Sequence, residues 1–597
     1  MKTVLLTAAL ATASPVALAQ TPMGDRNTQP VATGQQADMA GDTVEGPLAS
    51  EIETRVTKDS FGTELGSDTS SSAVEAVQRA YVQTMYKPIW THDGVTSLQD
   101  VASNLFSYGL VSDDVIESDL ENMVNQRFSD AGDPVSQAEA DIALTGAWLR
   151  LAQAISGGLT DEGEAKTSKK AAASYGLLPE LLVEAGQGNA ADTLETLEPD
   201  MNQYDQLKQA LQSYREIREE GGWLAIPEGD IVEAGETDPR VPAIRERLAA
   251  EGYEVENSIF TLVGNVVEQA AESNETSPAS SSEHAFLDTD ELKITPDPTR
   301  FDEKLAHAVE AFQTRHGIKE DGVIGPNTIS AMNESVDSKI ARIADTMERW
   351  RAFDGLDNRF IWANIPSYTA EGWDNGERKL AMRTIVGTAS RQTPTFNDQV
   401  EYAVANPRWY APVSIVRKDK LPKLQNDPGY AERGNYKVID RSTGEEVSAW
   451  SVNWNDPASA EKYRLVQMSG EGNALGQLKI IFPNQYSVYL HGTPGEHLFD
   501  RAKRAFSSGC IRLEEPTRMA RWIASEMPDT DAHKLDEAVS DQGLEKFNFE
   551  KEIPIHITYM TVTVDDDGRV NFWRDIYDRT DGIERVEKLA PLHDSDA

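Results

Sequence analysis

The stretch that decides the fold runs from residue 478 to residue 513 and reads "LKIIFPNQYSVYLHGTPGEHLFDRAKRAFSSGCIRL". It holds two short β-prone runs, "LKIIFP" and "YSVYLHG", bounded by turn-forming residues. Similar runs recur before it ("RFIWANIPSY", "LAMRTIVGT", "QVEYAVA") and after it ("IPIHITYMTVTV", "GRVNFW"). Many short strands at this spacing predict a β-sandwich or a partly closed barrel over residues 340–585. The Lys-rich stretch 413–456 interrupts the pattern, and we expect it to be an insertion that covers a site.

The same stretch contains the only cysteine of the chain, Cys510, nineteen positions after His491. A thiol is mostly protonated at neutral pH, so nucleophilic catalysis needs a neighbouring base. His491 ends one β-prone run, and Cys510 precedes residues 511–513, which read as a strand or a helix start. We therefore expect two adjacent element ends to bring the imidazole within hydrogen-bond reach of the thiol. The alternative is a buried cysteine that acts as a small hydrophobic residue.

The neighbours of Cys510 suit acyl chemistry. Gly509 has no side chain, so the backbone amides of Ser508, Gly509 and Cys510 can approach a substrate carbonyl as an oxyanion hole requires. On a strand, Arg512 shares the face of Cys510 and can hold a substrate carboxylate through two hydrogen bonds. The alternative for Arg512 is a surface ion pair with Glu514 or Glu515.

The N-terminal part of the chain changes character twice. Residues 1–19 carry Lys2, a short apolar run and the small residues Ala17-Leu18-Ala19, which is the pattern of a cleaved secretory signal peptide. An uncleaved anchor is the alternative, although the run is shorter than the roughly 20 apolar residues that span a membrane. Residues 20–73 are polar and are predicted to be a disordered linker. Apolar residues at helical spacing then predict a helical scaffold domain over 74–224.

A second small unit is expected at residues 230–335, with a flexible loop insertion at about 266–290. Its second half contains the pattern "AVEAFQ…HGI…DGVIGPNT". This pattern resembles the small three-helix peptidoglycan-binding domain of bacterial wall enzymes. Residues 586–597 are assigned to a tail.

Composition excludes several functions. The formal net charge is −43 and the pI is about 4.6, which argues against a nucleic-acid partner, because phosphate binding needs a basic surface. The nine histidines form no HExxH pair, and one cysteine cannot make a thiolate zinc site. We expect no metal and no cofactor. Ser508 does not lie in a G-x-S-x-G elbow, which argues against a serine hydrolase.

The motif "HGT…SSGCIRL" resembles the active-site signature of the L,D-transpeptidases, and the similarity continues through "IVGTASRQTPTF", "ANPRWYAPVSI", "LPKLQNDPGY" and "GNALGQLKIIFPNQYSVYLHGTP". With the helical domain and the wall-binding unit, the chain resembles the large periplasmic type of Gram-negative bacteria. The resemblance implies a multidomain α+β protein. Its parts would be the helical scaffold domain, the peptidoglycan-binding domain and a β-sandwich-like catalytic domain (YkuD-like) with a capping insertion at 413–456.

The same resemblance implies a reaction. Cys510 attacks the amide after the third residue, meso-diaminopimelate, of a tetrapeptide donor stem, and D-Ala leaves. The thioester then passes to the side-chain amine of an acceptor stem, which gives a 3-3 cross-link. His491 would be the base, with a backbone carbonyl near Gly492 orienting it. Tyr489 would line the site, and carbapenem-type β-lactams would acylate the thiol.

Some points stay open at this stage. Many family members have His directly before the Gly-Cys pair, whereas this chain has Ser508, so the role of position 508 is undetermined. Trp409 is a candidate for lining the substrate groove, with a core position as the alternative. An L,D-carboxypeptidase or wall-link hydrolase on the same site, or a non-catalytic peptidoglycan-binding protein, are the alternative functions. Expected partners are donor and acceptor stems and other wall-synthesis or carboxypeptidase proteins, and the expected compartment is the periplasm.

Overall fold

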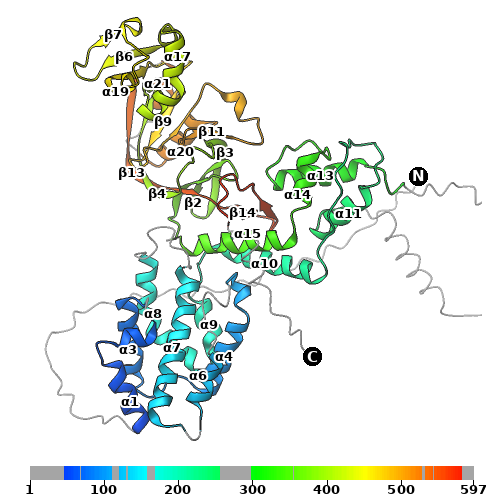
Figure 1. The fold of residues 1–597 in the computed structure, drawn as a ribbon, viewed down its shortest axis with the longest axis vertical. Coiled ribbons are helices and arrows are strands. Elements are labelled where there is room, and N and C mark those ends of the chain that lie inside the picture. Colours follow the sequence, from blue (N-terminus) through cyan, green and yellow to red (C-terminus); the bar gives the residue numbers. More distant parts are fainter. Residues whose placement is uncertain are drawn as a thin grey trace, which may run out of the picture. The chain divides into compact units, whose positions relative to one another are not determined.

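The computed structural model describes residues 46–580, apart from 67–68, 111–119, 130–131, 158–168, 256–296, 354, 528–531 and 542 (Figure 1). The signal-peptide prediction for 1–19, the loop insertion at 266–290 and the tail at 586–597 therefore lie outside the described residues. Within those residues, no helix combines the length and the apolar character that crossing a membrane requires.

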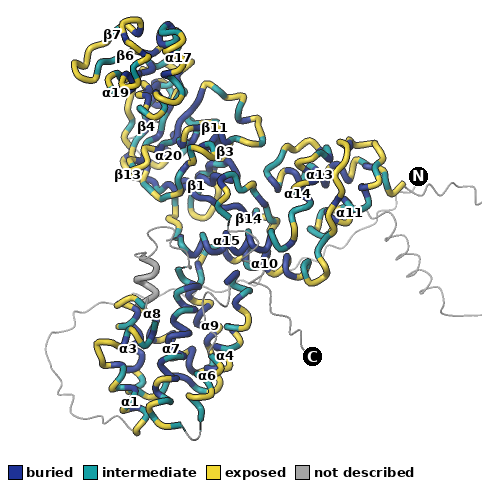
Figure 2. The backbone as a smooth tube through the Cα atoms, in the orientation of Figure 1, coloured by how far each residue is buried: buried dark blue, intermediate teal, exposed yellow. Residues whose placement is uncertain are grey.

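The first part of the described chain is a bundle built around one central helix. That helix, α7 (Pro134–Gly157), is buried at most positions from Ala138 to Ile155, because most of its residues there are small or apolar, while Glu139 is exposed. Figure 2 shows this buried path between more exposed neighbours. The surrounding elements are α1 (Pro47–Val56), α2 (Phe61–Leu65), α3 (Ser71–Gln83), α4 (His92–Ser103), η1 (Leu105–Tyr108), α6 (Leu120–Arg127), α8 (Lys169–Glu184), η3 (Ala185–Asn189) and α9 (Ala190–Glu195).

The prediction of a disordered linker over 20–73 is wrong from residue 47 onward. Helices α1 and α2 lie in this range, and both pack against α7. Their apolar residues are few, but Ile52, Phe61 and Leu65 are all buried in the core of the bundle. The prediction failed because it relied on overall composition, whereas a few apolar side chains stabilise a helix when they pack against the apolar surface of a neighbouring helix.

Helix α10 (Asn202–Glu219) packs against a different core from that of the bundle. It lies along α15 (Val336–Arg351) and contacts a two-stranded hairpin, β14 (Val562–Val564) and β15 (Val570–Phe572). The side-chain amide of Gln203 donates to the carbonyl of Val564 at 2.7 Å. The predicted helical domain 74–224 thus ends in a helix whose apolar face is shared with residues far along the chain.

The small unit after α10 contains three described helices, α11 (Val241–Ala250), α13 (Glu303–Arg315) and α14 (Pro326–Met332). Asp302 caps α13 by accepting a hydrogen bond from the backbone N–H of Leu305 at 2.9 Å, and Pro326 begins α14. Two isolated bridges, Val232 with Ile324 and Thr237 with Arg300, close the unit.

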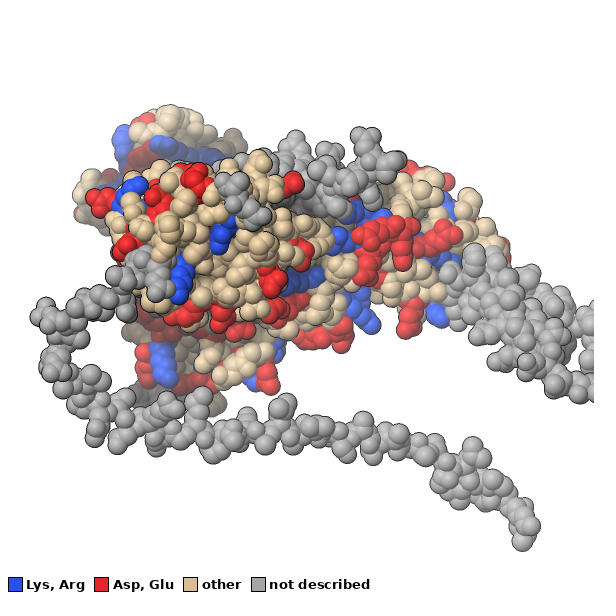
Figure 3. All heavy atoms as spheres, turned by 90° about the horizontal axis from the view of Figure 1, so that it is seen from below, with Lys and Arg blue, Asp and Glu red and all other residues tan. Residues whose placement is uncertain are grey.

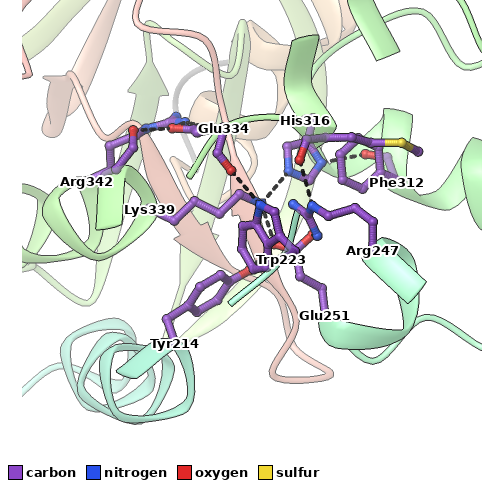
Figure 4. A network of polar contacts seen from close by, with 11 residues as sticks. Tyr214, Trp223, Arg247, Glu251, Phe312, His316, Glu334, Lys339 and Arg342 are labelled. Atoms are coloured by element: carbon purple, nitrogen blue, oxygen red, sulfur yellow. Dashed lines mark hydrogen bonds and ion pairs between the residues drawn. The ribbon is translucent and has the colours of Figure 1, made fainter. Parts of the chain in front are cut away.

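A buried group of charges connects this unit to α15 (Figure 4). The ammonium of Lys339 pairs with Glu251 and donates to Nε2 of His316 at 2.9 Å. Arg247 donates to the second oxygen of Glu251 at 2.8 Å. Lys339 and Arg247 hold the pKa of Glu251 well below its ordinary value against the opposing effect of burial, and burial lowers the pKa of Lys339 to about 8.

The C-terminal part contains a nine-stranded sheet in the order β11-β3-β12-β10-β9-β4-β13-β1-β2. Because β2 at one end also pairs with β3 near the other, the sheet closes on itself around an apolar core. Helices α20 (Pro516–Ala524) and α21 (Ala532–Ser540) add apolar residues to that core. The strands are β1 (Arg359–Asn364), β2 (Thr369–Asp374), β3 (Glu377–Gly387), β4 (Phe396–Ala405), β9 (Leu478–Ile481), β10 (Leu490–His491), β11 (Ala505–Ser507), β12 (Ile511–Leu513) and β13 (Glu545–Thr558).

The predicted insertion forms a separate four-stranded sheet with its own apolar core, and it is longer than predicted. It takes in strands on both sides of 413–456, because β5 (Trp409–Tyr410) and β8 (Tyr463–Gln467) pair with each other. We call this segment, residues 409–475, the cap. Its other elements are α16 (Val413–Ile415), η4 (Val416–Lys420), α17 (Leu421–Asn426), α18 (Tyr430–Arg433), β6 (Tyr436–Asp440), β7 (Glu446–Val447), η5 (Ala449–Ser451) and α19 (Ser459–Lys462).

The acidic composition is visible at the surface. Figure 3 shows Asp and Glu side chains spread over one face of the molecule, with Lys and Arg side chains between them. Many basic groups of the described chain are engaged in ion pairs with acidic side chains, such as Arg55 with Glu51, Glu64 and Glu139.

Candidate active site

Strand register places His491 and Cys510 on one face of the sheet. β10 pairs with β12 in parallel, with Leu490 opposite Ile511 and His491 opposite Arg512. Leu490 and Ile511 point into the core, so their neighbours in each strand point to the opposite face. Tyr489, His491, Cys510 and Arg512 therefore share the outer face. We call it the site face.

The orientation of His491 is determined by the backbone that follows it. Nδ1 lies 2.5 Å from the carbonyl oxygen of Gly492, which can only accept, so Nδ1 carries the proton. In the neutral ring this leaves Nε2 as a proton acceptor. The ring is 5% exposed, and its pKa is lowered to about 3 by burial and by the nearby cations Arg512 and Lys479. Burial thus favours the neutral imidazole of His491 at physiological pH.

The surroundings of Cys510 favour the protonated thiol. Its Sγ donates to the carbonyl of Ser487 at 3.8 Å, and burial raises the pKa of the thiol above its ordinary value. The expected hydrogen bond between Cys510 and His491 is absent from the interactions of the described residues. Burial acts on both groups in the same sense, because it disfavours the charged thiolate and the charged imidazolium.

The backbone before Cys510 is held in an unusual conformation. Gly509 has φ of +118°, which side-chain-bearing residues rarely adopt. The hydroxyl of Ser507 accepts from the N–H of Gly509 at 3.0 Å and donates to the carbonyl of Cys510 at 2.6 Å. The hydroxyl of Thr393 donates to the carbonyl of Gly509 at 2.9 Å. The prediction that the Gly509 amide serves an oxyanion hole is corrected, because this N–H is already bonded to Ser507.

Ser508 has a partner that sequence reasoning missed. Its exposed hydroxyl accepts a hydrogen bond of 2.7 Å from Arg391, which lies in the loop between β3 and β4. The same guanidinium forms a two-point ion pair with Asp419 of the cap, at 2.7 and 2.8 Å. The motif "IVGTASRQTPTF" contains Arg391, but nothing in it indicated a partner 28 positions further along the chain.

The remaining predicted substrate-binding residues divide into two groups. Tyr489 lies on the site face, with its ring centre 5.5 Å from that of His491. Arg512 lies there too, without the surface ion pair considered above, because Glu514 pairs with Arg383 and Glu515 with Arg518. Trp409, in contrast, is 7% exposed and packs in the core of the cap. It is corrected to a core residue, because a side chain enclosed on all sides does not meet a substrate.

Sequence reasoning also missed Lys479. This residue lies directly opposite His491 in the antiparallel pair β9–β10, so its side chain joins the site face. The signal was present in "LKII", where a lysine stands between two buried positions, Leu478 and Ile480. Without the register, the lysine reads as an ordinary exposed strand residue. No group of three or more His, Cys, Asp or Glu side chains that could hold a metal occurs among the described residues.

Comparison with protein families matches three segments of the chain. The model described as the L,D-transpeptidase catalytic domain (YkuD) matches residues 358–539, a scaffold-domain model matches 75–211, and a model described as "Putative peptidoglycan binding domain" matches 286–332. The segment 358–539 contains both His491 and Cys510. These matches agree with the multidomain α+β architecture expected from the sequence.

Among curated proteins, a Haemophilus influenzae protein named "Putative L,D-transpeptidase" is 32% identical over 252 residues, which is 42% of this chain and 50% of that protein. The match thus spans about half the length of that relative. Two crystal structures are also similar. L,D-transpeptidase 1 of Mycobacterium tuberculosis is 15% identical, with a TM-score of 0.13 and coverage of 34% of this chain and 62% of that one. Residues 123–326 of the Xylanimonas cellulosilytica L,D-transpeptidase are 10% identical, with a TM-score of 0.15 and coverage of 56% and 99%.

Proposed function

Since residues 358–539 carry an L,D-transpeptidase catalytic domain and the chain also holds scaffold and peptidoglycan-binding domains, we propose that this protein forms 3-3 cross-links in peptidoglycan through a thioester on Cys510. The observation that carries the proposal is the shared face of His491 and Cys510, with Nδ1 of His491 bonded to the Gly492 carbonyl. This arrangement leaves Nε2 free to take the thiol proton.

The first half-reaction is an acyl transfer to the thiol. Sγ of Cys510 attacks the carbonyl between meso-diaminopimelate and D-Ala, while Nε2 of His491 takes the thiol proton. The C–N bond breaks, His491 gives the proton to the leaving nitrogen, and free D-Ala departs. Because the Gly509 N–H is occupied, the backbone amides of Ser508 and Cys510 are the proposed donors to the oxyanion.

The second half-reaction returns the enzyme to its starting state. The side-chain amine of an acceptor stem attacks the thioester, and His491 takes a proton from that nitrogen. The C–S bond breaks, the new amide forms the cross-link, and the proton returns to Sγ. Water attacking the same thioester would give a tripeptide instead, so exclusion of water favours cross-linking. We assign this role to the cap, whose apolar core includes Tyr489 at its edge.

The peptidoglycan-acting domains indicate work in the cell envelope, and peptidoglycan is the implied substrate. Export to the periplasm by a cleaved signal peptide at residues 1–19 belongs to the proposal. The acylation of Cys510 by the lactam carbonyl of carbapenem-type β-lactams also belongs to the proposal.

The test is mass spectrometry of diaminopimelate tetrapeptide muropeptides after incubation with the full-length protein. We expect a cross-linked dimer from the wild type and none from Cys510→Ala or His491→Gln. His497→Gln is the matched control, because His497 lies on the exposed turn η6 (Glu496–Leu498) between the two catalytic residues. Tripeptide without dimer would replace the proposal by a carboxypeptidase. No product from any variant would point to a wall-binding protein.

A further inference from the structure

Two cations flank the candidate catalytic pair on the site face. Lys479 of β9 lies opposite His491 on one side, and Arg512 of β12 lies opposite His491 on the other. Strands in a sheet are about 4.8 Å apart, so the two cations originate about 10 Å from each other across the central strand. The ammonium of Lys479 lies 6.0 Å from the ring centre of Tyr489, which places it over the site face.

Neither cation has a carboxylate partner among the described residues. Two arginines near this site do have carboxylate partners: Arg383 pairs with Glu514 and Asp500, and Arg391 pairs with Asp419. Nε of Arg512 is buried and makes no hydrogen bond within the described chain. In a chain with a net charge of −43, acids are plentiful, yet none of the described acids pairs with these two cations beside the nucleophile.

An unpaired, partly buried cation is costly unless an anion joins it. Lys479 and Arg512 are both partly buried, and this burial lowers their pKa values. A ligand carboxylate that enters such a site compensates for the hydration that the buried cation lacks, because the two groups form a charge-assisted hydrogen bond. The site face is therefore prepared for a ligand with two negative groups about 10 Å apart or less.

We propose that Lys479 is a specificity-determining residue that binds the free carboxylate at the far end of the donor diaminopimelate, while Arg512 holds the carboxylate of the leaving D-Ala. The inference rests on the proposed function. Arg512 follows Cys510 by two residues on the same face and suits the carboxylate close to the scissile amide. Lys479, across His491, suits the carboxylate separated from that amide by the diaminopimelate side chain. The donor is then recognised as a dianion.

The test compares two tetrapeptide donors, one with the free far carboxylate and one with that carboxylate amidated. Acylation is followed by the mass of the Cys510 adduct and by release of D-Ala. We expect wild type to prefer the free donor by about 10- to 100-fold in kcat/KM, the range of one charge-assisted hydrogen bond. Lys479→Met should abolish this preference by losing activity on the free donor only, and Lys479→Arg should retain most of it.

The matched control is Lys546→Met. Lys546 belongs to β13, which is separated from β9 by β4, and its ammonium lies over the ring of Tyr402, so its loss should leave the preference intact. If Lys479→Met lowers kcat/KM equally on both donors, or lowers it on neither, the assignment is overturned. Absence of any adduct with wild type would instead refute the proposed function, so the two failures are distinguishable.

A binding experiment provides a readout that does not depend on turnover. In the Cys510→Ala background, calorimetry with the free donor should show affinity about 10- to 100-fold weaker when Lys479→Met is added. With the amidated donor, the same change should have little effect. An equal decrease for both donors would indicate a structural role for Lys479 and overturn recognition of this carboxylate.

Discussion

Arg391 and Asp419 form a two-point ion pair that ties the cap to the loop between β3 and β4, at 2.7 and 2.8 Å. The pair lowers the pKa of Asp419 and raises that of Arg391, and it persists at neutral pH. Because Arg391 also donates to Ser508, one guanidinium connects the cap to the residue two positions before Cys510. Position 508 is thus part of a link to the cap.

Breaking this link should favour hydrolysis over cross-linking. Asp419→Asn removes the charge that holds Arg391, and a loosened cap admits water to the thioester. We expect the ratio of tripeptide to dimer to rise by about fivefold, which corresponds to about 1 kcal/mol for a partly exposed pair. Asp427→Asn is the control, because its partner Arg433 also belongs to the cap. An unchanged product ratio for Asp419→Asn would argue against the link.

The pH profile of acylation should be flat between pH 5 and pH 8. The base must be neutral, and the pKa of His491 is lowered to about 3, so the neutral form is lost only as the pH falls towards that value. The thiol pKa is raised, so Cys510 stays protonated over the same range. Steady-state kcat/KM from pH 4 to pH 9 tests this. An inflection near pH 6.5 would show that His491 has the ordinary pKa of a histidine side chain and would contradict this expectation.

Alkylation gives an independent measure of the thiol. A protonated thiol reacts slowly with iodoacetamide, because the thiolate is the nucleophile. The rate for Cys510 should therefore be below that of a free cysteine peptide at pH 7 and should increase up to at least pH 9. Fast alkylation at pH 6 would demonstrate a thiolate–imidazolium pair instead.

Gly509→Ala should damage catalysis more than stability. The added Cβ has room, since its nearest contact would be the Gln392 carbonyl at 3.5 Å, but φ of +118° is strained for alanine. A backbone shift would displace Cys510, and a misplacement of about 1 Å lowers kcat by about 100-fold. Gly495→Ala, at φ of −94° with only ordinary contacts, is the matched control. Both variants are compared by kcat and by thermal unfolding, and equal activity would contradict the proposed positioning role.

Lys339→Met should destabilise the small unit next to α15. The substitution leaves Glu251 buried with Arg247 as its remaining cation, and loss of one partner of a buried pair costs about 3–5 kcal/mol. Urea unfolding followed by tryptophan fluorescence suits this test, because Trp223 lies 3.6 Å from the Arg247 guanidinium. Adding Glu251→Gln should recover part of the loss. Lys319→Met, which removes an exposed ion pair with Asp321, is the control and should change the midpoint little.

The same network adds a pH dependence to stability. The pKa of Glu251 is held well below its ordinary value, so its contribution is present above about pH 4.5 and is lost as the pH falls further. Wild type should therefore lose more stability than Glu251→Gln between pH 5 and pH 3. Parallel losses in the two proteins would mean that other groups dominate acid unfolding.

Local patterns predicted the features that depend on near neighbours in the chain. Helical periodicity indicated α7 and α13, β-prone runs indicated β9 and β10, and the spacing of Cys510 and His491 indicated the candidate nucleophile and base. The linker prediction failed at α1, because composition alone does not show that α7 offers an apolar surface to Ile52. The assignment of Trp409 to a substrate groove failed because burial by the cap depends on a sheet closed by β8, more than fifty positions later.

The sequence by itself determined the fold class, the lone thiol and the residue types available to it. Only the tertiary structure decided which of these residues meet. Strand register places Lys479, His491 and Arg512 side by side. Loop packing brings the Gly509 amide to the Ser507 hydroxyl, and it brings Arg391 to both Asp419 and Ser508. The physical reason is that side-chain direction along a strand follows from a period of two, whereas the pairing of separate strands follows from how the whole core closes.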